Sequence, residues 1–290
     1  MTLIHVFPGQ GSHQTGMGRE LFPRYPHLVR RADQLLGYSV EDLCLNAPRE
    51  ELNDTRYTQC SMYVVGVLSY LDHVRNDGAV PSIVAGHSLG EYVALFAAGA
   101  FDFLTGLELV HRRAELMAAA GPGAMWAVIG LDEERVRTSL AEGGHGEVDI
   151  ANLNAPEQTV LSGPPAEVKA AAAALAEAAT AVVPLKVSGA FHSRRMAGAA
   201  QEFGAFLRGY RFAPLKLRVI ANTTAQPHTD ADLAAELERQ LTAPVRWSET
   251  VRYLLRQPEP RILEVGPGQV LTGLVRRIQG AEAPVAAAGR

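Results

Sequence analysis

The stretch "VAGHSLGEYVALF", residues 84–96, places a serine between two glycines where an apolar run passes into residues that favour a helix. A G-x-S-x-G sequence at such a junction is typical of a nucleophile elbow, a sharp strand-to-helix turn that exposes a serine hydroxyl. Gly86 and Gly90 fit this turn because its backbone folds back close to itself. The same letters also suit an ordinary turn, since glycine and serine are common in turns. The pattern alone therefore leaves both interpretations of Ser88 open.

The composition indicates a globular protein without a general affinity for polyanions. The chain has 290 residues, of which 47% are hydrophobic and 20% charged, and its formal net charge is −4. It therefore lacks the basic field that would attract nucleic acid or an anionic membrane. No uncharged apolar run approaches the roughly 20 residues of a membrane helix, and the N-terminus does not resemble a signal peptide. Cys44 and Cys60 match no metal or redox spacing. We expect a cytoplasmic monomer with no metal, no nucleic-acid partner and no membrane partner.

Predicted strands and helices alternate along most of the chain. Apolar runs that indicate strands lie at residues 3–7, 81–86, 217–222 and 261–266. Helical patterns span residues 27–37, 57–76, 89–101, 103–120, 191–210 and 269–280, and residues 281–290 resemble a loose tail. This alternation predicts an α/β fold with a largely parallel sheet.

The pattern changes in the middle of the chain. The expected order is strand, helix, two strands, helix and strand, at residues 124–131, 132–143, 147–154, 158–163, 165–180 and 181–189. This β-α-β-β-α-β order is that of ferredoxin-like modules. We therefore expect a small ferredoxin-like subdomain at residues 125–191, inserted into a catalytic domain of residues 1–124 and 192–290.

A serine nucleophile needs a base, and His192 is the best placed of the nine histidines. It closes the apolar run at residues 181–191, and α/β folds place their chemistry at strand ends. The alternative is a core-edge histidine satisfied by the backbone. No Asp or Glu at a strand end completes a triad, so a carbonyl or an amide side chain is expected to orient the base. The Leu89 N–H, at the start of the next helix, is a candidate oxyanion donor.

Arg113 is the residue most informative about substrate. A helical wheel over residues 103–117 places Arg113 inside the apolar arc and Arg112 nearly opposite. A guanidinium that faces the interior is costly unless an anion pairs with it. Two interpretations remain open: a structural salt bridge to an internal carboxylate, or a bidentate clamp for a substrate carboxylate.

Several ordered motifs are spread over nearly the whole chain. They are "FPGQGS" at 7–12, "TQ" at 58–59, "GHSLGEY" at 86–92, "LVHRRAELM" at 109–117, "ANLNAP" at 151–156, "GAFHS" at 189–193, "QLTAPVRW" at 240–247 and "EVGPGQVLTGL" at 264–274. With these motifs the chain resembles the malonyl-CoA:acyl carrier protein transacylases and the acyltransferase domains of polyketide synthases. The resemblance implies an α/β-hydrolase-like core with an inserted ferredoxin-like subdomain, which is the fold that the alternation of elements predicts.

The resemblance also implies catalytic roles for individual residues. Ser88 is similar to the acylated nucleophile of the family, and His192 to its general base. Gln10 and the Leu89 amide resemble the oxyanion hole. Gln240 matches the position that helps to orient the histidine.

Further residues are implied to contact the substrate. Arg113 resembles the residue that grips the free carboxylate of the extender unit. Gln59, Asn152 and Asn154 fall in family-like contexts near the cleft.

The sequence before the histidine bears on selectivity. The "AFH" ending at His192 and the leucine after Ser88 resemble malonyl-selective members, in which the residue matching Phe191 narrows the pocket against an α-methyl group. Gly189 departs from the histidine or alanine typical of that motif. The alternative reading of Phe191 is an ordinary core aromatic.

The implied reaction moves a malonyl group from malonyl-CoA through a Ser88 ester to the phosphopantetheine thiol of an acyl carrier protein, without a further cofactor. "GAFHS" and "RRADQLLGYSVEDLC" at 30–44 resemble discrete trans-acting acyltransferases of polyketide assembly lines. The alternatives are a malonyl transacylase of fatty-acid synthesis, a serine acyl hydrolase that edits carrier proteins, and a non-catalytic partner with the same fold. Carrier proteins are typically acidic, so we consider four arginines as docking contacts: Arg194, Arg195, Arg208 and Arg211.

Overall fold

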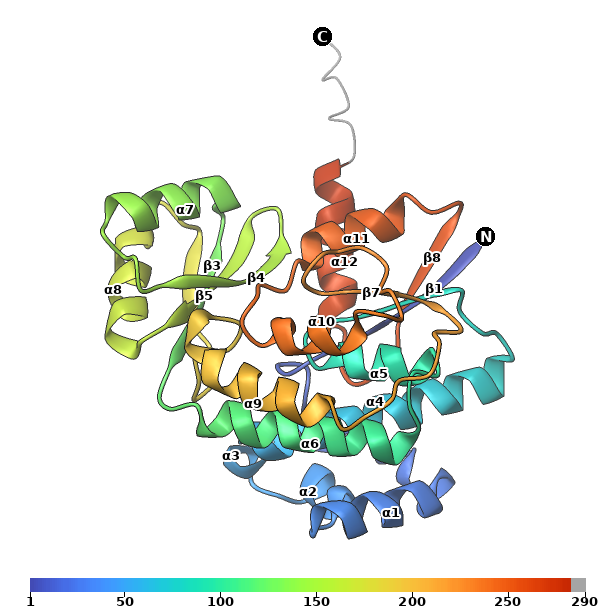
Figure 1. Cartoon of the computed structure of the whole chain (residues 1–290). Coiled ribbons are helices and arrows are strands. Elements are labelled where there is room, and N and C mark those ends of the chain that lie inside the picture. The colour runs from blue at the N-terminus through green and yellow to red at the C-terminus, as the bar shows by residue number, and fades with distance from the viewer. Residues whose placement is uncertain (283–290) are drawn as a thin grey trace.

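The structure is a computed structural model that describes residues 1–282, apart from the side chains of Arg49 and Asp77. It contains a parallel sheet and an antiparallel sheet, both flanked by helices (Figure 1). The parallel sheet consists, in spatial order, of β7 (Arg218–Ile220), β2 (Ile83–Gly86), β1 (Thr2–Phe7) and β8 (Pro260–Glu264). The structure thus has the predicted α/β class.

Helices cover both faces of the parallel sheet, and alternate residues of β1 enter different cores. Ile4 and Val6 pack in one cluster with α11 (Trp247–Leu255) and α12 (Val270–Glu282). Phe7 belongs to the larger cluster on the opposite face. That cluster includes residues of α4 (Thr55–Asp77), α5 (Gly90–Ala97) and α6 (Phe103–Ala119). Burial on both faces explains why these strands read as continuous apolar runs rather than alternating ones.

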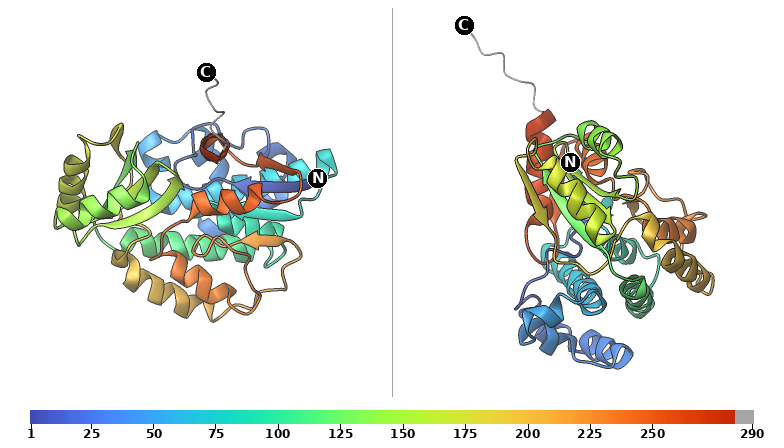
Figure 2. Two further views of the ribbon diagram at one scale, coloured as in Figure 1. Left: turned by 90° about the horizontal axis from the view of Figure 1, so that it is seen from above. Right: turned by 90° about the vertical axis from the view of Figure 1, so that its left-hand side faces the viewer.

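The second sheet has the ferredoxin-like topology. Its elements along the chain are β3 (Ala124–Ile129), α7 (Glu133–Glu142), β4 (Asp149–Ala155), β5 (Gln158–Gly163), α8 (Pro165–Leu175) and β6 (Ala181–Pro184). The strands lie in the order β4-β5-β3-β6, and every neighbouring pair is antiparallel. Figures 1 and 2 show this green-to-yellow unit at one end of the molecule, beside the parallel sheet. The exact domain limits, 124/125 and 191/192, stay a prediction.

The remaining elements are short. They are the 3-10 turns η1 (Phe22–Arg24) and η2 (Arg194–Met196) and the helices α1 (Pro26–Leu36), α2 (Val40–Leu45), α3 (Arg49–Leu52), α9 (Ala197–Leu207) and α10 (Leu233–Gln240). We did not expect α2, α3, α10 or α11 from the sequence, because helices of four to nine residues carry too little periodicity. Within residues 1–282, no helix combines the length and the apolar character needed to cross a bilayer.

Two predicted boundaries around His192 are wrong. The strand expected at 181–189 ends at Pro184, and the helix expected at 191–210 starts only with η2. Beyond Pro184 the chain still follows β3 but loses regular pairing: Leu185 N donates to Met125 O (2.9 Å), and no further ladder pair follows. His192 therefore lies in a loop and not at a strand end.

The expected tail at 281–290 is also partly wrong, because α12 continues through Glu282. Residues 283–290 lie outside the described part of the chain.

The turn between β2 and α5 has the tight geometry of a nucleophile elbow. Ser88 has a φ of 51°, in the left-handed region that non-glycine residues rarely adopt. A Cβ atom on Gly86 would lie 1.8 Å from the carbonyl carbon of Gly90, and one on Gly90 would lie 2.0 Å from Phe7 O. Both glycines are therefore required by close backbone approach, and an ordinary turn does not explain them.

We expect Gly86→Ala to lower the free energy of unfolding by at least about 2 kcal/mol, because the new methyl group overlaps backbone atoms that cannot move aside. Gly273→Ala is the matched control: Gly273 is exposed in α12, and a Cβ there meets nothing within 4 Å. It should stabilise the protein by up to about 1 kcal/mol, because alanine favours the helix. Urea unfolding measures both values, and equal stability of the two variants would contradict the tight elbow.

Candidate active site

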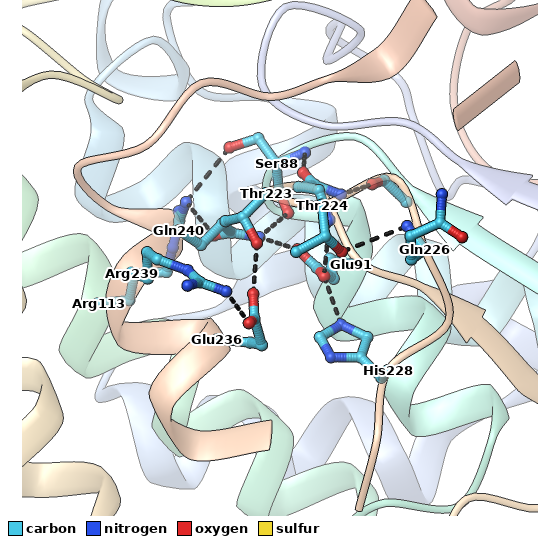
Figure 3. Close-up of polar contacts among 12 residues, drawn as sticks. Ser88, Glu91, Arg113, Thr223, Thr224, Gln226, His228, Glu236, Arg239 and Gln240 are labelled. Carbon is cyan, nitrogen blue, oxygen red and sulfur yellow. Dashed lines mark hydrogen bonds and ion pairs between the residues drawn. The ribbon is translucent and has the colours of Figure 1, made fainter. Parts of the chain in front are cut away.

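The parallel sheet brings polar residues from three distant segments to one edge. β1, β2 and β7 are parallel, so the residues that follow them meet at the carboxyl ends of the strands. Gln10 follows β1, Ser88 follows β2 and Asn222 follows β7. Figure 3 shows the polar contacts around Ser88 at this edge.

Ser88 and His192 form the central pair. Ser88 Oγ lies 2.7 Å from His192 Nε2. On the other side of the ring, Nδ1 donates to the backbone carbonyl of Gln240 (2.8 Å). A carbonyl can only accept, so the proton is on Nδ1 and the Nε2 lone pair faces the serine hydroxyl. The sequence predicted a carbonyl or an amide as the orienting group, and the structure places a carbonyl there.

The environment of His192 keeps its imidazole neutral. The residue is 4% exposed, and its backbone φ of 54° lies in the left-handed region that non-glycine residues rarely adopt. Burial, together with the nearby positive charge of Arg113, lowers the pKa of His192 to about 3. A neutral imidazole can accept a proton from serine at any pH well above that value.

Arg113 points from α6 into the site and is 1% exposed. Its Nη1 donates to Gln59 Oε1 (2.6 Å), and its Nη2 donates to Gln240 Oε1 (3.0 Å) and to Ser88 Oγ (3.2 Å). The guanidinium also lies over the ring of Tyr92, 5.5 Å from its centroid. Among the described residues no carboxylate hydrogen-bonds to Arg113, and its Nε has no partner. The structural salt bridge considered from the sequence is therefore not formed within residues 1–282.

Asn222, which the sequence analysis missed, fixes the elbow. Its Oδ1 accepts from Ser88 N (2.7 Å), and its Nδ2 donates to Gly86 O (2.6 Å). The side chain thus brackets the strained residue from both sides. The available signal was its position: Asn222 ends the predicted strand at 217–222, at the same sheet edge as Ser88.

The two oxyanion candidates lie at the same opening. Leu89 precedes α5, and within the described chain its backbone N–H has no protein acceptor. Gln10 lines the cavity with Ser88 and Leu89, and its Nε2 donates to Thr55 Oγ1 at 3.4 Å. The Leu89 amide is therefore free to receive an oxyanion, and Gln10 stands beside it.

Apolar side chains also line the cavity. They come from Met117, Met125, Leu185, Val187 and Phe191. A Cβ atom at position 189 would lie 2.4 Å from the Phe191 ring, so Gly189 provides the space into which that ring packs. Phe191 is both buried, at 4% exposure, and part of the cavity wall, so the two readings of it are compatible.

The asparagines differ in their positions. Asn152 is buried and lines the cavity. Asn154 lines only the adjoining hollow and bonds to His87 Nε2 through its Oδ1 (2.8 Å). His87, the neighbour of Ser88, packs edge-on against Trp247 and takes no part in the Ser88 contacts.

Two of the four arginines considered for carrier docking already have partners. Arg194 makes a bidentate pair with Asp149, and Arg195 lies 3.5 Å from Glu147. No group of three or more His, Cys, Asp or Glu side chains within residues 1–282 is arranged to hold a metal ion.

Comparison with known proteins defines the class. Residues 4–287 match the family model described as the acyl transferase domain, and the chain belongs to this family. The polyketide biosynthesis malonyl CoA-acyl carrier protein transacylase PksC of Bacillus subtilis is 48% identical over 279 residues, which cover 96% of this chain and 97% of PksC.

Two solved structures are also close. The malonyl CoA-acyl carrier protein transacylase of Burkholderia pseudomallei matches with a TM-score of 0.93 and 43% identity, covering 97% of this chain and 98% of that one. PlMCAT:AntF, a type II PKS acyl-carrier protein in complex with its malonyl-transacylase, matches with a TM-score of 0.92 and 37% identity, covering 97% and 94%. These similarities confirm the α/β-hydrolase-like core with a ferredoxin-like subdomain.

The neutral state of His192 makes a prediction about pH. We expect the kcat/KM for acylation of Ser88 by an acyl-CoA to stay level from pH 8 down to about pH 5, because the base remains unprotonated below the ordinary histidine pKa of about 6.5. Stability moves with the same group: below pH 6.5 the unfolded chain binds a proton that native His192 does not, so this group makes the fold less stable as the pH falls. Stopped-flow release of CoA measures the profile, and an acid limb centred near pH 6.5 would count against this account.

Proposed function

We propose that this protein is an acyl carrier protein S-malonyltransferase that acts in trans in polyketide biosynthesis. It transfers the malonyl group of malonyl-CoA, through an ester on Ser88, to the phosphopantetheine thiol of an acyl carrier protein. Malonyl-CoA and the carrier are its substrates, and the reaction needs no additional cofactor.

One observation carries the choice of substrate: the guanidinium of Arg113 is buried beside the serine hydroxyl. Its Nη2 lies 3.2 Å from Ser88 Oγ, and its hydrogen-bond acceptors among the described residues are neutral. A buried cation without an anionic partner is unfavourable, and a carboxylate that enters the cavity relieves it through two charge-assisted hydrogen bonds. An acyl group with a free carboxylate therefore fits this site better than a neutral one.

The geometry supports a ping-pong mechanism. Ser88 Oγ attacks the thioester carbonyl while His192 Nε2 takes its proton, and the Leu89 N–H stabilises the negative charge on the oxygen. When the tetrahedral intermediate collapses, the carbon–sulfur bond breaks and His192 returns the proton to the CoA thiolate. The carrier thiol then attacks the Ser88 ester by the same steps in reverse. Removal of one oxyanion donor costs roughly 3 kcal/mol in comparable sites.

Two features favour a transferase for polyketide synthesis over the alternatives. A hydrolase that acts on neutral acyl chains does not require the Arg113 guanidinium. A transferase that holds a malonyl group does, because that group has a free carboxylate. The 48% identity with PksC extends over almost the full length of both chains and supports a polyketide role over fatty-acid synthesis.

We expect a Ser88-linked malonyl group to appear on incubation with malonyl-CoA and to leave when holo carrier protein is added. Intact-mass spectrometry of both proteins follows the group, and Ser88→Ala should abolish the adduct and the transfer. If free malonate forms equally fast with and without the carrier, the protein is a hydrolase. If the wild type never forms an adduct, the protein is a non-catalytic member of its family.

We expect Arg113→Ala to slow acylation by malonyl-CoA about 100-fold, because two charge-assisted hydrogen bonds to the carboxylate are lost. Acylation by acetyl-CoA, which has no carboxylate, should change less than about threefold. Arg112→Ala is the control on the same helix, since Arg112 pairs with Glu115 and Glu202 at the surface. An equal loss with both thioesters would show that Arg113 does not select the carboxylate.

A further inference from the structure

A buried carboxylate lies next to the Ser88 elbow, and the proposed mechanism does not use it. Glu91 follows Ser88 by three residues, in the first turn of α5, and is 2% exposed. Its oxygens accept from three donors: Asn222 N (3.1 Å), His228 Nε2 (2.6 Å) and Gln240 Nε2. Figure 3 labels Glu91 together with His228 and Gln240. A carboxylate removed from water requires such donors, so this group is held in one position.

His228 is the one titratable side chain that hydrogen-bonds to Glu91 among the described residues. Its side chain is fully buried, and its Nδ1 has no partner within the described chain. Among the described residues, the Glu91 contact is therefore the one hydrogen bond that fixes the ring. The loop that carries His228 is tied to α10 where Thr223 Oγ1 donates to Glu236, which also pairs with Arg239 (Figure 3).

Glu91 determines which way the amide of Gln240 points. A carboxylate can only accept, so the NH₂ end of Gln240 faces Glu91 and the Ser88 carbonyl (3.1 Å to the latter). The oxygen end is then left for Arg113 Nη2 (3.0 Å). If the amide rotated by half a turn, its oxygen would face the Glu91 carboxylate and its NH₂ group would face the Arg113 guanidinium, so both hydrogen bonds would be lost. The Gln240 side chain is thus a fixed dipole between an anion and a cation.

The same carboxylate also supports the elbow. The Asn222 N–H that bonds to Glu91 belongs to the residue whose side chain brackets Ser88 N and Gly86 O. Glu91 is therefore connected to the serine backbone through Asn222, and to the guanidinium through Gln240.

We propose that Glu91 and His228 form a buried positioning pair that sets the Ser88 elbow and the orientation of Arg113 at once. His228 donates the hydrogen bond that keeps the Glu91 carboxylate within hydrogen-bonding distance of Gln240 and Asn222. The pair contacts neither substrate nor the reacting atoms; it acts through the residues that do. This inference rests on the proposed function, because the effect of the pair is measured as a change in the selectivity for malonyl over acetyl groups.

The test compares His228→Leu, which removes the donor, with His228→Gln, whose NH₂ group can replace it. We expect the Leu variant to be acylated by malonyl-CoA about tenfold more slowly, since one buried charge-assisted hydrogen bond is lost. The malonyl-to-acetyl rate ratio should fall several-fold, because Arg113 loses its fixed partner. The Gln variant should recover both values to within about threefold of wild type. His27→Leu, at an exposed histidine of α1, is the control.

The readouts separate positioning from folding. Thermal unfolding is recorded for every variant, and Glu91→Gln takes the place of His228→Leu if the latter does not fold. Equal losses with malonyl-CoA and acetyl-CoA, or no recovery in His228→Gln, would overturn the proposal in favour of a purely structural role. An unchanged rate ratio in a folded Leu variant would overturn it as well. Failure of the proposed function is distinguishable, because in that case wild type itself acquires no malonyl group.

Discussion

The buried guanidinium of Arg113 is the constraint on which the rest of the site depends. It lies beside the Ser88 hydroxyl at 1% exposure, in a place where an unpaired charge is strongly unfavourable. Two side-chain amide oxygens, from Gln59 and Gln240, and the face of Tyr92 stabilise it in the free protein. These neutral partners satisfy the cation without neutralising it. The site thereby keeps a positive charge beside Ser88, and under the proposed function this charge pairs with the carboxylate of the malonyl group.

The same charge influences the base. Arg113 and burial together lower the pKa of His192, so the imidazole meets Ser88 as an acceptor. The backbone carbonyl of Gln240 fixes the tautomer, and the side chain of Gln240 contacts Arg113. Gln240 thus accepts a hydrogen bond from His192 with its backbone carbonyl and one from Arg113 with its side-chain oxygen. A carbonyl stands where a triad would place a carboxylate, and the buried carboxylate of Glu91 instead accepts a hydrogen bond from the side-chain Nε2 of Gln240.

The sequence predicted the parts of this site that depend on local pattern. The glycines around Ser88 indicated an elbow, because close backbone approach restricts the residue type at a given spacing. The helical period placed Arg113 in the interior, since every residue of a regular helix turns by a fixed angle. The two sheets followed from the alternation of elements, while short helices such as α2 and α10 did not, because they have too few turns to show a period.

Contacts between distant segments could not be predicted in this way. The sequence predicted His192 as the base because it follows an apolar run taken as a strand, but the residue lies in a loop and not at a strand end. Asn222 and His228 meet residues more than 130 positions away, and no spacing rule relates such positions. Gln240 was expected to orient the histidine, but only the folded chain shows that its backbone carbonyl does so. These contacts form only when the C-terminal end of α10 and the loop after β7 meet the Ser88 elbow in the folded chain.

The most direct test of this account is a crystal structure of the protein after reaction with malonyl-CoA. We predict a malonyl ester on Ser88 Oγ. Its free carboxylate accepts two hydrogen bonds from the Arg113 guanidinium, and its ester carbonyl oxygen accepts one from the Leu89 N–H. An acyl group bound at another residue, or a malonyl carboxylate that points away from Arg113 into solvent, would contradict the account.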